Sequence, residues 1–291
     1  MHISEAFSFY LTQLEADGRS RHTIRQRERH VLLLARWLAD VGAGGEIAAL
    51  GHQDVARILA SDVAQRRADG GKRKATSANA LRSSLKAFFS YCHEAGLVAA
   101  NPARLVKRAL CGTPPPRHLR DDERNRLLQV LADAEGPEAE RDHTLFHLML
   151  ATGVRLSSTL GLDVEDLDLD AGEAVLRSFK GGRVERVFLP RALAEHLRRF
   201  VGDRTAGPVF RGRGDARLSA RHAQRRFSAW AARARVRPGA TPHSLRHSFA
   251  RSLLDRTHDL LLVKLALHHR SISSTMVYAE GCAERLRAAL A

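Results

Sequence analysis

The stretch AVLRSFKGGRVERVFL, residues 174–189, contains the clearest strand signal in the chain. Two runs rich in branched and large apolar residues, Ala174–Phe179 and Val184–Leu189, flank the turn Lys180-Gly181-Gly182. Glycine readily adopts the positive φ angles that a tight hairpin turn requires. The sequence therefore predicts a β-hairpin with Lys180 at its tip.

Helical periodicity dominates on the amino-terminal side of this hairpin. In four stretches of the first hundred residues, apolar side chains recur every three or four positions, as on the buried face of a helix. The first predicted helix starts at Ile3 and stops at Gly18, the second runs from about Thr23 to Ala39, the third begins near Asp54, and the fourth spans about Ser77 to Ala95.

A proline-rich connector follows this helical bundle. Asn101-Pro102 ends the bundle, and GTPPP at residues 112–116 is typical of a stiff, extended linker. We therefore predict a helical domain over residues 1–110, a linker over 111–118 and a second domain over 119–291.

The second domain is expected to be helical apart from the hairpin. A helix that is apolar on most sides is predicted around Thr144–Ala151, and helices dominate again from Arg191 onward. The predicted fold class is therefore mainly α with a small β-hairpin or sheet in the second domain, an α+β arrangement.

Basic and acidic side chains are distributed unevenly along the chain. The whole sequence has 47 Lys+Arg against 32 Asp+Glu, a formal charge of +15. Residues 1–116 carry 17 basic and 10 acidic side chains (+7), residues 121–176 carry 4 and 14 (−10), and residues 177–237 carry 17 and 4 (+13). A segment as basic as residues 177–237 is typical of a surface that faces nucleic acid. A solvated arginine-rich face is the alternative.

Other classes of protein are disfavoured. The longest apolar runs, such as Val31–Ala35 and Leu260–Val263, fall far short of the ~20 residues that span a bilayer. The first residues lack the basic and apolar pattern of a secretory signal. Three cysteines without a CxxC pair favour a reducing compartment. We expect a cytoplasmic protein with no membrane partner.

Common nucleotide and metal motifs do not occur in the sequence, among them the GxxxxGK[ST] phosphate loop and HExxH. His243 and His247 lie four apart, and His268 and His269 are adjacent, but neither pair has a carboxylate or cysteine at ligand spacing. The acidic run at 163–170 is interpreted as a solvated turn. We predict no metal site and no cofactor.

Four separated motifs contain the residues best suited to chemistry. Arg155 follows a buried helix, where a charge is unusual unless it points into a cleft. Lys180 lies at the hairpin tip, and His243 and Arg246 share one helix face because they are three residues apart. Tyr278 ends the segment LALHHRSISSTMVY. Taken singly, each has a structural interpretation: an ion pair for the arginine, a turn for the lysine and packing for the tyrosine.

In combination, the strings ATGVRLS (151–157), KGG (180–182), HSLRH (243–247) and LHHRSISSTMVY (267–278) resemble the tyrosine recombinase (phage integrase) family, closest to its Xer-like members. The resemblance covers most of the chain, because the helical first domain is also similar to that family's core-binding domain. It implies an N-terminal four-helix SAM-like core-binding domain followed by a tyrosine recombinase catalytic domain.

The resemblance also implies a catalytic role for six residues. Arg155 and Arg246 match the pair that grips the scissile phosphate, and Lys180 matches the hairpin lysine that protonates the leaving 5′-hydroxyl. His243 would accept the proton of the nucleophile, and His269 would donate a hydrogen bond to the phosphate. Tyr278 matches the nucleophile that forms a 3′-phosphotyrosine. Strand exchange through this ester requires neither ATP nor a metal.

Two positions depart from the family's pattern. Ser158 stands where a glutamate is usual, which puts in question a contact that would orient Arg155 or His243. His268 stands where a glycine is usual, which affects the backbone turn that aims His269.

Double-stranded DNA is the expected partner, bound with the protein as a homotetramer on two sites or together with a second recombinase. The basic residues expected to contact DNA are Arg25, Lys72, Arg73, Lys74, Arg82 and Lys86 in the first domain, and Arg221, Arg225 and Arg226 in the second.

Three alternatives to a recombinase remain at this stage. An inactive relative would bind DNA without forming a covalent adduct, and an enzyme like a type IB topoisomerase would relax supercoils without exchanging strands. A metal nuclease would lose its activity in EDTA.

Overall fold

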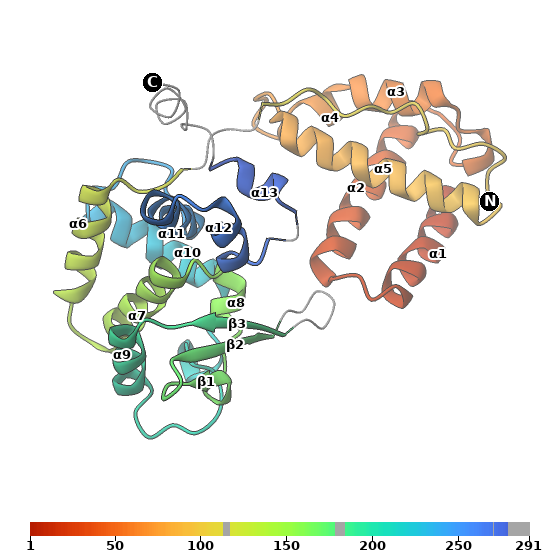
Figure 1. Cartoon of the computed structure of the whole chain (residues 1–291). Coiled ribbons are helices and arrows are strands. Elements are labelled where there is room, and N and C mark those ends of the chain that lie inside the picture. Colours follow the sequence, from red (N-terminus) through yellow and green to blue (C-terminus); the bar gives the residue numbers. More distant parts are fainter. Residues whose placement is uncertain (113–116, 178–183, 270, 279–291) are drawn as a thin grey trace. The chain divides into compact units, whose positions relative to one another are not determined.

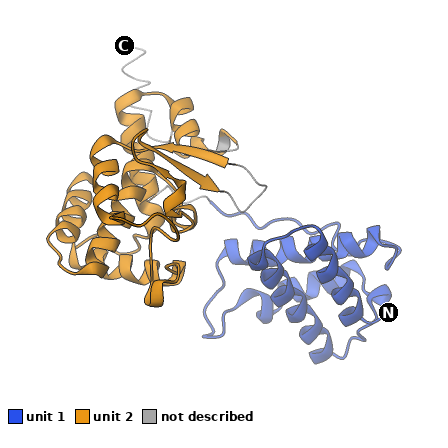
Figure 2. Ribbon diagram, turned by 90° about the horizontal axis from the view of Figure 1, so that it is seen from below, with its two compact units in different colours: residues 1–113 blue, residues 114–291 orange. Residues whose placement is uncertain are grey.

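The computed structural model describes residues 1–112, 117–177, 184–269 and 271–278. They form a mainly helical structure with one small sheet (Figure 1). The chain divides into two compact units, Met1–Thr113 and Pro114–Ala291 (Figure 2). This division falls inside the segment predicted as the linker. In the part of the chain described, no helix is both long and apolar enough to cross a membrane.

The first unit is a bundle of helices. Its helices are α1 (Ile3–Ala16), α2 (Arg21–Asp40), α3 (His52–Ala60), α4 (Asp62–Gln65) and α5 (Ala75–Glu94), with a 3₁₀ turn, η1, at Ile47–Ala49. The four predicted helices are observed, and the short α4 is an addition. Local sequence sets the boundaries, as at α2, where the side chain of Ser20 accepts a hydrogen bond from the Thr23 amide.

The core of this unit forms where α5 packs against α1 and α2. Phe88 and Phe89 are fully buried, and the ring of Tyr10 on α1 lies 5.6 Å from that of Phe88. A buried polar contact also joins α2 to α5, because His30 Nδ1 lies 2.8 Å from Ser84 Oγ. The apolar stripes predicted for these helices are therefore core.

The second unit places most of its helices around α7, with the sheet to one side (Figure 1). Its elements are α6 (Asp121–Ala132), α7 (Pro137–Thr152), α8 (Leu156–Leu160), η2 (Val164–Asp166), β1 (Leu167–Asp168), β2 (Glu173–Arg177), β3 (Val184–Phe188), α9 (Arg191–Val201), η3 (Arg213–Asp215), α10 (Ala220–Arg233), α11 (Pro242–Thr257), α12 (Leu260–Ala266) and α13 (Ser273–Met276).

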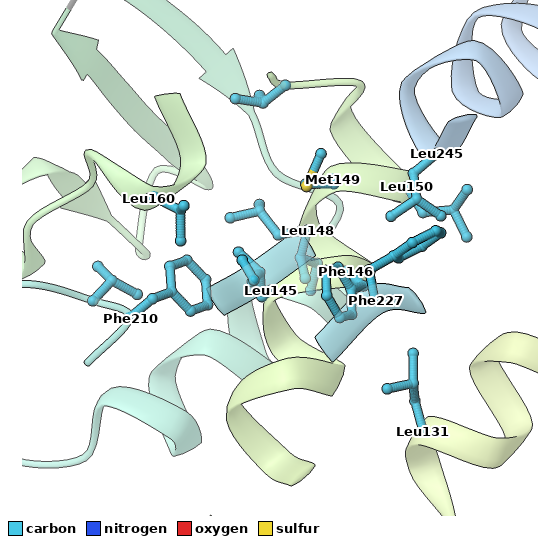
Figure 3. Close-up of a cluster of buried hydrophobic side chains, with 14 of the residues drawn as sticks. Leu131, Leu145, Phe146, Leu148, Met149, Leu150, Leu160, Phe210, Phe227 and Leu245 are labelled. Atoms are coloured by element: carbon cyan, nitrogen blue, oxygen red, sulfur yellow. The ribbon is translucent and has the colours of Figure 1, made fainter. Parts of the chain in front are cut away.

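The helix α7 forms the centre of the core. It is apolar on most sides, as the sequence predicts, and Figure 3 shows its side chains meeting those of neighbouring helices. The ring of Phe146 packs edge-on against that of Phe227 from α10, with 5.2 Å between centroids. Leu245 of α11 is fully buried in the same cluster. Packing of α11 on α7 brings together two of the sequence motifs.

The sheet is antiparallel with the strand order β1-β2-β3. Strands β2 and β3 form the predicted hairpin, with Glu173 opposite Phe188 and Arg177 opposite Val184. The third strand, β1, pairs with β2 and comes from the acidic run that we interpreted as a turn. The predicted tip with Lys180 lies outside the residues that the structure describes.

Candidate active site

Arg246 is a buried cation on α11. Its side chain is held by two backbone carbonyls, since Nη1 donates to Gly153 O at 2.5 Å and Nη2 donates to Leu267 O at 2.7 Å. Burial, together with the charge of Arg155, lowers the Arg246 pKa to about 10, so that the guanidinium stays protonated at neutral pH. Its remaining N–H groups are donors for an anion.

The turn after α7 requires a glycine. Gly153 has a φ of +68° and ends the helix in the left-handed conformation. A Cβ at this position would lie 2.3 Å from Cδ1 of Phe249 on α11, so the two helices approach too closely for any other residue. The turn leads directly to Arg155, the exposed N-cap residue of α8. Among the described residues, no hydrogen-bond or ion-pair partner holds the Arg155 side chain.

Two histidines of α11 lie within one helical turn of Arg246 and share a face with each other. The rings of His243 and His247 are 4.5 Å apart between centroids and nearly perpendicular. Burial lowers the pKa of His243, and the charges of Arg246 and Arg155 lower it further. Burial likewise lowers the pKa of His247, to about 4, so that both imidazoles are neutral at physiological pH.

Tyr278, directly after α13, points inward. Only 5% of the residue is exposed, and it packs against apolar residues of α11 and α12. Its hydroxyl lies 2.7 Å from His247 Nδ1, and the two rings are 5.6 Å apart. Burial raises the pKa of this phenol, whereas the charges of Arg246 and Arg155 act to lower it. The predicted nucleophile therefore lies within the electrostatic influence of both predicted phosphate-binding arginines.

His269 lies between α12 and α13. Its backbone amide donates to Lys264 O at 3.1 Å, and its Nδ1 lies 2.9 Å from Thr275 Oγ1. Burial, followed by the charges of Arg246 and Arg155, lowers its pKa to about 4. The ring is thus held by α13, on the same side of the unit as the two arginines.

His268 adopts a conformation that normally favours glycine. Its φ is +50°, a left-handed value that costs about 1 kcal/mol for a residue with a Cβ. Its Nδ1 lies 3.9 Å from Oε2 of Glu185 on β3. The turn in front of His269 therefore forms despite the departure from the family's glycine, and a sheet residue contacts it.

The second departure has a different outcome. Ser158 is half-buried on α8, and its hydroxyl forms no hydrogen bond with any residue in the described part of the chain. The contact expected from a glutamate at this position is not replaced by the serine.

Most of the predicted DNA-contacting residues lie on the surface of their own unit. Arg25, Lys72, Lys74, Lys86, Arg221 and Arg225 are exposed, and Arg82 is half-buried. Two of the predicted residues donate to backbone carbonyls: Lys86 to Val106 O at 3.2 Å, and Arg73 to Val63 O and Arg66 O.

Arg226 has a different environment. Its Nε donates to the fully buried carboxylate of Asp142 at 2.5 Å, and Nη1 lies 3.4 Å from Glu138. Its guanidinium also lies over the ring of Trp230. Because this side chain already neutralises a buried acid, it is less available to a DNA phosphate than the exposed arginines of α10.

No cluster of three or more metal-ligating side chains with suitable geometry occurs among the described residues. Within the acidic run, Asp166 is buried rather than solvated, and Arg177 of β2 donates to it at 2.7 Å. That carboxylate also accepts a hydrogen bond from the Asp163 amide and so closes the η2 turn. Its role is to connect the turn to the sheet.

Sequence reasoning missed two residues of the site, His247 and Glu185. The spacing of four from His243 places His247 on the same helix face, but the same spacing also suits a pair of metal ligands and does not by itself indicate a contact with Tyr278. No local pattern indicated Glu185, because its contact with His268 joins segments far apart in the sequence.

Comparison with known proteins shows the family of this chain. The model of the phage integrase family matches residues 117–285, and that of the phage integrase N-terminal SAM-like domain matches residues 7–96. Tyrosine recombinase XerC of Neisseria gonorrhoeae is 32% identical over 282 residues, which are 94% of this chain and 89% of the relative. Tyrosine recombinase XerD of Ralstonia nicotianae is 31% identical, over 93% of this chain and 87% of its own.

Solved structures show the same fold. XerH bound to its difH substrate has a TM-score of 0.71 at 21% identity and covers 92% of this chain and 79% of its own. A lambda integrase dimer (residues 75–356) bound to a COC′ core site has a TM-score of 0.74 at 18% identity, over 94% of this chain and 97% of that one.

The chain belongs to the phage integrase family. It is a site-specific tyrosine recombinase, similar over most of its length to XerC and XerD. The predicted family, fold class and enzymatic class are thereby confirmed.

Proposed function

We propose that this recombinase cuts and rejoins duplex DNA through a covalent 3′-phosphotyrosine at Tyr278. One observation carries the assignment: the Tyr278 hydroxyl lies inside the second unit, 2.7 Å from His247 Nδ1. Burial raises the pKa of this phenol, and the charges of Arg246 and Arg155 act against that rise. A phenol with an ordinary pKa is about one part in a thousand ionised at neutral pH. Nearby cations and a proton acceptor are what it needs to attack phosphorus.

In the proposed step, Tyr278 Oη forms a bond to phosphorus while the bond to the 5′-oxygen breaks. Charge builds up on the non-bridging oxygens, and Arg155 and Arg246 stabilise it with charge-assisted hydrogen bonds. His269 adds a further donor. The family resemblance assigns protonation of the departing 5′-oxygen to Lys180.

The ester formed retains roughly the energy of the original phosphodiester bond. A 5′-hydroxyl from another strand can therefore attack it and reseal the DNA without ATP or a metal ion. This chemistry is exchange of strands rather than hydrolysis.

Both units contribute to DNA binding in this proposal. The net charges of +7 over residues 1–116 and +13 over 177–237 favour contact with phosphates, chiefly by exposed residues such as Arg25, Lys72, Lys74, Arg221 and Arg225. The related XerH and lambda integrase structures were solved with DNA. We place the protein in the cytoplasm, where bacterial DNA is found.

The proposed assembly is a homotetramer on two DNA sites, or an assembly on those sites that also contains a second recombinase. The lambda integrase neighbour is a dimer on its site. In this chain, α12 exposes Leu261 and Leu265, 57% and 61% accessible, and residues 279–291 contain Leu286 and Leu290. The exposed leucines of α12 are suited to contacts between protomers.

A nicked suicide duplex tests the nucleophile. On such a substrate the wild type is expected to form an adduct that survives SDS, with or without EDTA, and Tyr278→Phe is expected to form none while binding DNA normally. Tyr91→Phe, which alters a half-buried tyrosine of the first unit, is the control and retains the adduct. An equal yield from Tyr278→Phe would falsify the assignment, and loss of cleavage in EDTA would favour a metal nuclease.

A further inference from the structure

The residue in contact with the nucleophile is not one of the six implied by the family resemblance. Tyr278 Oη lies 2.7 Å from Nδ1 of His247. His243 packs edge-on against the His247 ring and forms no hydrogen bond with Tyr278 among the described residues. Among the described residues, His247 and not His243 is therefore the imidazole within hydrogen-bond distance of the phenol.

The surroundings of His247 keep its imidazole neutral. Burial lowers its pKa to about 4, and every titratable group that acts on it as a charge lowers it further: His243 and Arg246 of α11, His118 ahead of α6, and His269 after α12. None of these groups is a carboxylate that would favour the imidazolium. A neutral ring with its hydrogen on Nε2 presents Nδ1 as an acceptor toward the phenol.

We propose that His247 accepts the phenolic proton of Tyr278 during cleavage, and that His243 is left to contact the phosphate. This inference rests on the function proposed above. The geometric requirement for a general base is met, because donor and acceptor are already at hydrogen-bond distance in the absence of DNA.

The proton balance of the step is simple. As Oη bonds to phosphorus, its proton moves to His247 Nδ1, and the ring becomes an imidazolium. The 5′-oxygen leaves with its electron pair and takes a proton from the acid on the other side of the phosphorus. In the rejoining step, His247 returns its proton to the departing tyrosine oxygen.

The test is the single-turnover rate of adduct formation on the suicide duplex from about pH 6 to about pH 9.5. Asparagine places an amide close to the position of Nδ1 but cannot take up a proton. His247→Asn is therefore expected to be about 10²- to 10³-fold slower than wild type near pH 7. Its rate should rise roughly tenfold per pH unit as the tyrosine ionises into solvent, so that the deficit shrinks with rising pH.

Two controls make this outcome specific. His243→Asn alters a phosphate contact, and its deficit is expected to be the same at every pH. DNA affinity and thermal unfolding of His247→Asn should match those of wild type, and His247→Gln provides a second variant if the first unfolds.

The possible results separate the two claims. If wild type forms no adduct, the proposed function itself fails. If wild type cleaves and the His247 variants are as fast, faster, or slower by one constant factor at all pH values, His247 is not the proton acceptor. A faster variant would mean that His247 restrains the tyrosine.

Discussion

At the scale of single residues, the site depends on how the buried guanidinium of Arg246 is hydrogen-bonded. Arg246 is 2% exposed, and two backbone carbonyls, Gly153 O and Leu267 O, accept its hydrogen bonds. Those carbonyls belong to the turns that precede Arg155 and His269. One buried side chain therefore aligns two other residues of the site.

Replacement of Gly153 tests this alignment. Gly153→Ala adds a Cβ in a left-handed conformation against Phe249, and the two effects together should lower the free energy of unfolding by about 2–4 kcal/mol. The rate of adduct formation by Gly153→Ala should also fall, because the turn that positions Arg155 moves. Urea unfolding and the cleavage assay measure both effects.

Gly96→Ala is the matched control. Gly96 also has a positive φ, +73°, but a Cβ there would meet no atom within 4 Å. Only the backbone cost of about 1 kcal/mol is then expected, with unchanged cleavage. Equal destabilisation by the two variants would refute the steric account.

At the scale of elements, buried polar contacts fix the relative position of two helices more specifically than the packing of apolar side chains does. The clearest in the first unit is His30 of α2 with Ser84 of α5. Burial lowers the His30 pKa to about 4, so the native state holds this ring neutral.

This contact predicts acid sensitivity. Below the ordinary histidine pKa near 6.5, the unfolded chain binds a proton that the native His30 does not. The contribution of His30 to the free energy of unfolding is therefore fully present above that pH. It is lost as the pH drops toward 4, and the loss is about 3 kcal/mol at most. His30→Gln should unfold with a shallower dependence on pH over this interval. Urea unfolding of both proteins at several pH values checks it, and parallel curves would contradict it.

Contacts between elements also explain why sequence patterns found the hairpin but not its partner. Two runs of branched and large apolar residues, separated by a turn with two glycines, indicate β2 and β3. In contrast, β1 has only two residues, and it exists because its backbone pairs with β2. Likewise, Glu185 meets His268 only because the fold brings β3 to the turn after α12.

At the scale of the whole molecule, charge determines how the protein meets DNA. Each neutralised phosphate releases condensed counterions, so the affinity falls steeply with salt. The double variant Lys72→Gln/Lys74→Gln removes two exposed cations of the first unit. The slope of log affinity against log salt should decrease by about two.

A paired arginine provides the comparison. Arg66 lies in the same unit, but its Nε donates to Asp62 at 2.9 Å. Arg66→Gln should change the slope little, because that charge is already compensated. If both variants have the wild-type slope, these lysines do not contact DNA.

The sequence by itself determined the helical class of the first hundred residues, the hairpin strands and the family. Those features depend on short-range periodicity and on motifs a few residues long. The tertiary structure alone decided which imidazole touches the phenol, which arginine is committed to a buried acid and which carboxylate reaches the His268 turn. Such contacts join segments tens of residues apart. The fold brings α11 to the end of α13, α10 to α7 and β3 to the turn after α12, and these approaches create the three contacts.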